Sequence, residues 1–105
     1  MDPEKAAEAV EINIADAVSS SSNLFLRSSA VDLFEMIENM PEREIIIDFK
    51  NIDFANRAFA HEYLTQKSKS SKMISEVHLS EDVKIMLDIV FKVHHREFEQ
   101  RYAGL

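Results

Sequence analysis

The sequence predicts an α/β domain in which three to four mostly parallel strands are packed by three helices. Segments with strand-like apolar patterns alternate along the chain with segments of helical periodicity. The clearest strand is EIIIDF at residues 44–49, a near-continuous apolar run rich in β-branched residues. Such a run is typical of a strand buried on both faces in a parallel sheet that helices cover. The alternating order of strands and helices favours the same arrangement.

The length and composition suit one globular domain. The chain has 105 residues, of which 46% are hydrophobic and 30% charged, and it has no cysteine. The absence of cysteine excludes disulfides and thiolate chemistry. The net charge of −7 argues against nucleic-acid binding, because that binding draws on basic side chains. The sequence also lacks an apolar run of the ~20 residues that a membrane span needs, and a signal-peptide core. We therefore expect a cytoplasmic protein that binds neither nucleic acid nor membrane.

The first half of the chain predicts a strand and a helix before the 44–49 strand. Residues 10–14 alternate apolar and polar side chains, which indicates a strand. Residues 24–26 are a short apolar segment that fits either a strand or a loop. Ser29 followed by Asp32 resembles a capping box, so we expect a helix to begin near Ser29 and to end before Pro41.

The second half predicts a helix that begins at Asn56, a loop at 65–72, a strand at 73–79 and a last helix at about 81–101. Ser80 is the expected N-cap of that last helix. Its apolar arc is wider than one sheet can cover, and two interpretations stay open. Either other segments of the chain cover the remainder, or the helix forms a homodimer or a partner surface. The residues expected in self-association are Ile85, Ile89, Val93 and Phe98. We expect a flexible N-terminus at 1–7, the domain at 8–93, and an extension of the last helix at 94–105.

The sequence offers little that indicates catalysis. Its one glycine, Gly104, excludes the glycine-rich loops that hold phosphates. The histidines lie on different expected elements and lack the spacings of common metal motifs, so we expect no metal, no cofactor and no enzyme activity. Asp48 is unusual because it lies in an apolar strand. We expect it to accept backbone N–H bonds from the following turn as a buried structural acid, with a catalytic role as the alternative.

The segment IIIDFKNIDFANRAFAHEYL, residues 45–64, resembles the strand–turn–helix signature of STAS domains, the fold of anti-sigma-factor antagonists. With LFLRSSAVDLFEMI before it and SEDVKIMLDIV after it, the chain looks like the STAS-like domain family of unknown function. The resemblance covers about residues 8–93. In antagonists of this fold, a serine at the start of the helix is phosphorylated. Here the turn reads Asn56-Arg57-Ala58-Phe59, so the phosphorylatable serine is absent.

The resemblance implies a non-enzymatic regulatory or scaffolding module that binds a protein partner through the turn and helix at 54–64. The expected partner-binding residues are Phe54, Asn56, Arg57, Ala58, Phe59 and His61. Arg57 would suit an acidic or phosphorylated partner. The alternative is a small-ligand or nucleotide-binding module that uses a cleft at the carboxyl ends of the strands. In that cleft, the side chains of Asp48, Asn56, Arg57 and His61 would line the ligand site.

Overall fold

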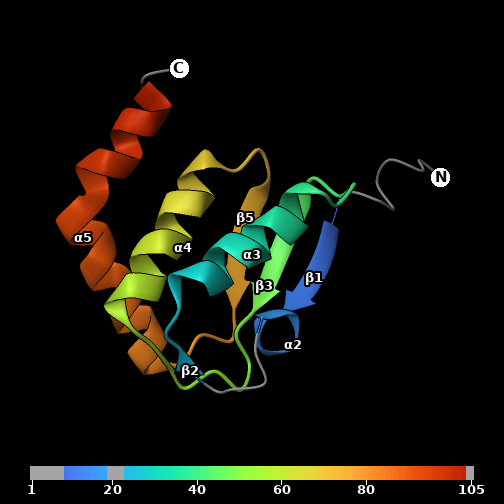
Figure 1. Cartoon of the computed structure of the whole chain (residues 1–105), viewed down its shortest axis with the longest axis horizontal. Helices are drawn as coiled ribbons and strands as arrows, with labels where there is room; N and C mark the ends of the chain where they lie inside the picture. Colours follow the sequence, from blue (N-terminus) through green and yellow to red (C-terminus); the bar gives the residue numbers. More distant parts are fainter. Residues whose placement is uncertain (1–8, 19–22, 104–105) are drawn as a thin grey trace.

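Figure 1 shows the computed structural model of the chain, which describes residues 9–18 and 23–103, with side chains up to residue 98. The α/β class is confirmed. The main sheet is parallel and has three strands in the order β1 (Ala9–Asn13), β3 (Glu44–Asp48) and β5 (Met73–Val77). The expected flexible N-terminus at 1–7 lies outside the described residues.

A second, two-stranded parallel sheet pairs β2 (Asn23–Leu24) with β4 (Phe54–Ala55). It lies near the carboxyl ends of the main strands (Figure 1). The helices of the described residues are α2 (Ile14–Val18), α3 (Arg27–Glu38), α4 (Arg57–Lys69) and α5 (Glu81–Ala103). The short helix α2 and the pairing of β2 with β4 were not expected from the sequence. None of these helices combines the length and the apolar character that crossing a membrane requires.

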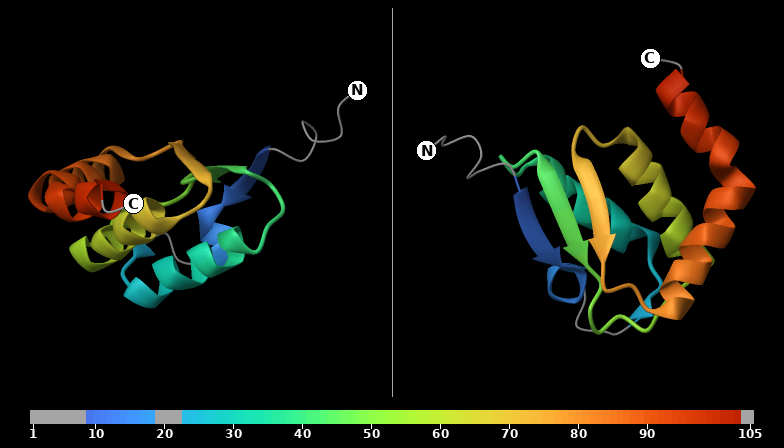
Figure 2. Two further views of the ribbon diagram at one scale, coloured as in Figure 1. Left: turned by 90° about the horizontal axis from the view of Figure 1, so that it is seen from above. Right: turned by 180° about the vertical axis from the view of Figure 1, so that it is seen from behind.

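The helices cover only one face of the main sheet. Figure 2 shows α3 and α4 beneath the sheet, with α5 beside α4 at the β5 side. The expectation that the central strand is buried on both faces is therefore wrong. Ile45 and Ile47 lie on the covered face and are fully buried. Ile46, between them in the strand, points to the other face and is partly exposed. The apolar run of β3 predicted helices on both faces, but α5 packs against α4 and does not cover the second face of the sheet.

The core is centred on the ring of Tyr63 on α4. Its ring makes edge contacts with Phe34 of α3 and with Phe49 after β3, and it stacks on Phe59 one turn away along α4. Val83 and Val90 bring α5 to the interior of the domain. These contacts join three helices to the sheet, so burial of apolar surface provides the main driving force for this arrangement.

Two helix boundaries differ from the predictions. Helix α3 begins at Arg27, and its N-cap Leu26 makes no side-chain hydrogen bond, so the expected capping box at Ser29 does not form. Helix α4 continues to Lys69 through residues expected to be a loop. Thr65 and Ser68 are buried, and the Ser68 hydroxyl donates to the Thr65 carbonyl oxygen. Tertiary packing therefore overrides the loop-like composition of this segment.

Helix α5 continues unbroken past residue 93, where we expected the domain to end. Phe98 lies within the expected C-terminal extension, yet its side chain is only 4% exposed. Its ring stacks on Phe91 and lies near His61 of α4. The part of α5 around Phe98 is thus packed on the domain. The buried Phe98 side chain is not available for the self-association that the sequence predicted for it.

Candidate functional site

The start of α4 is held to β2 by Asn56. Asn56, where the sequence predicted this helix to begin, is the N-cap of α4, and its Oδ1 accepts the Phe59 N–H at 2.9 Å. Its Nδ2 donates to the Phe25 carbonyl oxygen at 3.1 Å, and its backbone N–H donates to the Leu24 carbonyl oxygen at 2.9 Å. One residue therefore caps the helix and fixes the backbone of the segment that follows β2.

Large apolar side chains are exposed at this junction. Phe25 is 49% exposed and Leu26 is 63% exposed. The Phe25 ring packs edge-on against the partly buried Phe54 ring, with centroids 6.1 Å apart. Arg57, the first residue of α4, is exposed, and Ala58 is partly exposed. We name this group the α4-entry surface, defined by Phe25, Leu26, Phe54, Arg57 and Ala58.

The structure divides the residues that the sequence assigned to partner binding. Phe54, Arg57 and Ala58 belong to the α4-entry surface, and Asn56 supports it from beneath. The Phe59 side chain is 1% exposed and packs against Tyr63, so it belongs to the core and not to a docking surface. His61 contacts His94 and Glu97 of α5 through one side of its ring, and its Nδ1 lies 3.5 Å from Nη1 of Arg27, the residue after Leu26. Phe25 and Leu26 were missed because their neighbourhood depends on the pairing of β2 with β4.

Asp48 lies at the carboxyl end of β3 and is only partly buried, so it is not the buried acid expected from the sequence, although it does accept a backbone N–H from the following turn. Its Oδ1 accepts the Lys50 N–H at 2.9 Å in the turn that follows the strand. The same oxygen lies 2.9 Å from Nδ1 of His78, which follows β5. The hydrogen bond with His78 and that from Lys50 lower the pKa of Asp48 below its ordinary value. The carboxylate thus links two loops at one end of the sheet.

The alternative ligand cleft required Asp48, Asn56, Arg57 and His61 to converge. Three of these side chains instead contact different neighbours. Asp48 pairs with His78, Asn56 caps α4, and His61 contacts α5. The positions of these side chains therefore support a ligand cleft only weakly. The exposed side chains of the α4-entry surface support protein docking more strongly.

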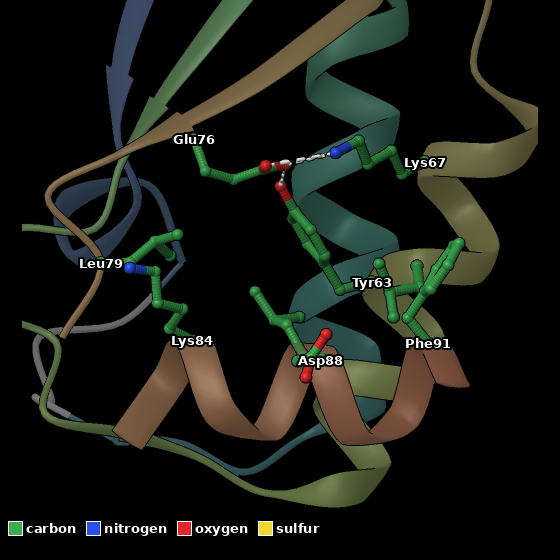
Figure 3. A pocket seen from close by; sticks show the side chains of 9 residues that line it. Tyr63, Lys67, Glu76, Leu79, Lys84, Asp88 and Phe91 are labelled. Carbon is green, nitrogen blue, oxygen red and sulfur yellow. Dashed lines mark hydrogen bonds and ion pairs between the residues drawn. The ribbon is translucent and has the colours of Figure 1, made fainter. Parts of the chain in front are cut away.

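A cavity of about 240 Å³ lies between α4, β5 and α5 (Figure 3). Within it, Tyr63 Oη donates to Glu76 Oε2 at 2.5 Å, and Lys67 Nζ lies 2.9 Å from the same oxygen. Burial and the negative charge of Glu76 raise the pKa of Tyr63 well above its ordinary value. These three side chains form hydrogen bonds and an ion pair with one another, so the cluster acts as a structural link from α4 to β5. The cavity is also smaller than the roughly 300 Å³ at which ligand pockets usually begin.

A second polar cluster lies between α4 and α5, where His61, His94 and Glu97 meet. Glu97 Oε1 lies 3.5 Å from His61 Nε2, and Glu97 Oε2 lies 2.8 Å from His94 Nδ1. The centroids of the two imidazole rings are 4.5 Å apart. The hydrogen bond with His94 lowers the pKa of Glu97 below its ordinary value. Only the spacing of His94 and Glu97, three residues apart on a helix, signals this cluster in the sequence.

Comparisons with protein-family models, with curated proteins and with solved structures gave no significant match to the chain. The resemblance to STAS-like domains therefore rests on the residues quoted above.

Proposed function

We propose that this chain is a cytoplasmic, STAS-like, non-enzymatic regulatory or scaffolding module that binds a protein partner through the α4-entry surface. The observation that carries the proposal is the exposure of Phe25 and Leu26 beside the start of α4. Clustered exposed side chains of this size commonly mark a contact surface. The Asn56 bonds hold the backbone beneath them, which reduces the entropy lost when a partner orders the segment.

The chemistry of this surface indicates the kind of partner. Phe25 and Leu26 suit an apolar anchor on the partner, and Arg57 suits a carboxylate or a phosphate beside that anchor. No hydroxyl is present at residues 57 and 58, so a kinase switch at these positions is excluded. We expect regulation, where it occurs, to come through a charge on the partner.

Affinity capture from a lysate of the source cell tests this function. The bait is the whole chain, and the variants are Arg57→Glu and Phe25→Ser. We expect a stoichiometric protein that the wild type retains and that both variants lose. The matched control is Arg43→Glu, which makes the same charge change at an exposed residue before β3, at the opposite end of the sheet. Equal retention by the wild type, Arg57→Glu and Phe25→Ser would contradict the assignment of this surface.

We also propose that the module self-associates through α5. Ile85, Ile89 and Val93 are 47%, 40% and 61% exposed, and they follow one another at intervals of four residues along the helix. Residues with this spacing form a continuous stripe on one side of a helix. A second copy of the chain, with the same stripe, would bury these side chains in a symmetric contact.

A further inference from the structure

We propose that His61, His94 and Glu97 form a binding site for a divalent transition-metal ion of the Zn²⁺ type between α4 and α5. One ligand atom from each of the three residues lies within 4.8 Å of the other two. Two imidazoles and a carboxylate are a donor set that zinc and neighbouring first-row metals accept. This site is independent of the proposed docking function.

The ligand atoms lie near the spacing that a single ion needs, with up to 4.8 Å between them. In a tetrahedral zinc site with ligands at about 2.0–2.1 Å, neighbouring ligand atoms lie about 3.4 Å apart. The Nε2 atom of His61 lies 3.5 Å from Glu97 Oε1, and His94 Nδ1 lies 2.8 Å from Glu97 Oε2. Small rotations of the side chains would bring both imidazoles and one carboxylate oxygen to the required spacing. Three protein ligands leave a fourth position for water or for another ligand.

The environment of His61 supplies a second observation that points to a ligand. Its Nε2 atom is closed off from solvent and has no hydrogen-bond partner of good geometry among the described residues. Its nearest charged neighbour, Glu97 Oε1, lies 3.5 Å away. A buried nitrogen with so long a contact is poorly satisfied, and a metal ion would satisfy it better. The ring of the buried Phe98 lies 6.2 Å from the His61 ring and limits its movement. His94 and Glu97 are held by a long, continuous helix, so all three ligands start close to their binding positions.

Arg27 is the charged neighbour that opposes the metal. Its Nη1 lies 3.5 Å from His61 Nδ1 and 3.8 Å from Glu62 Oε1. Because arginine only donates, this contact favours the proton on Nε2 of neutral His61, the atom that the metal needs. Metal binding therefore requires the proton to move to Nδ1 and Arg27 to turn toward solvent. More than half of the Arg27 side chain is already exposed, which makes that movement easy.

Calorimetric titration of the untagged chain with Zn²⁺ tests the site. We expect one equivalent to bind, and His94→Gln and Glu97→Gln each to weaken binding by at least about tenfold, since even indirect ligand supports contribute that much. Arg27→Gln should tighten binding, because it removes a competing donor and a positive charge. Mg²⁺ should not compete, since it prefers oxygen ligands and keeps much of its water.

The matched control is His95→Gln, which removes an exposed histidine beside His94 whose Nδ1 contacts the Lys92 carbonyl oxygen. This variant should bind Zn²⁺ like the wild type. Imidazole NMR signals provide a second measurement, in which the metal should shift the resonances of His61 and His94 and leave those of His78 unchanged. Absence of binding would overturn the proposal, as would equal weakening in His95→Gln or unchanged affinity in both His94→Gln and Glu97→Gln.

Discussion

Asp48 Oδ1 lies 2.9 Å from His78 Nδ1, so a side-chain pair joins the loops that follow β3 and β5. The backbone of both loops is unusual at this place. Asn51 and His78 have positive φ angles of 71° and 57°, in the left-handed region that non-glycine residues rarely occupy. The Asp48 carboxylate binds within the first loop through Lys50 N–H and within the second through His78. We infer that this carboxylate offsets part of the conformational cost of both loops.

The Asp48 pair makes stability depend on pH. The pKa of Asp48 is lower in the folded state than in the unfolded chain, where its ordinary value is 3.8. The ionised carboxylate therefore stabilises the fold fully at pH values above the pKa of the unfolded chain. That stabilisation is lost as pH falls through the lower folded pKa. We expect Asp48→Asn to reduce the free energy of unfolding by about 1 kcal/mol at neutral pH. Urea unfolding should show this difference shrinking at pH values below 3.8. Asp32→Asn, at an exposed carboxylate on α3, is the control, and a deficit that stays constant with pH would contradict the expectation.

The fold class and several local features could be predicted because they depend on short stretches of sequence. The cap at Asn56 and the hydroxyl of Ser80, which accepts the Val83 N–H at 3.2 Å, are decided within three residues. The end of α4 could not be predicted in this way. Thr65 and Ser68 have the composition of a loop, and they are helical because the packing of α4 buries them.

The candidate sites were less predictable, because each joins segments far apart in the chain. His61 comes close to His94 only once α5 has packed along α4. Phe25 forms a surface with Phe54 only once β2 pairs with β4. Phe59 and Phe98 were predicted to lie on contact surfaces, but both are buried. The sequence alone does not tell which aromatic side chains of a helix will be buried.

Asn56 is expected to control both the stability of α4 and the order of the α4-entry surface. Asn56→Ala removes the cap to Phe59 N–H and the bond to the Phe25 carbonyl oxygen, and we expect a loss of about 1–2 kcal/mol in the free energy of unfolding. Asn56→Asp keeps an acceptor for the cap but loses the donor to Phe25. It should therefore retain most of the stability while amide exchange around Phe25 accelerates. Unchanged exchange around Phe25 in both variants would show that this bond does not order the segment.

The stripe on α5 yields a prediction about mass. A dimer that buries Ile85, Ile89 and Val93 cannot accommodate a charge at its centre, because a desolvated carboxylate without a partner is strongly unfavourable. We expect the wild type to show a dimer population by light scattering at roughly 100 μM, decreasing on dilution by mass action. Ile89→Glu should be monomeric across the same range. Val31→Glu, which places the same charge at an exposed apolar residue of α3, should behave like the wild type. A monomeric wild type at the highest concentration, or equal dissociation by both variants, would refute self-association through α5.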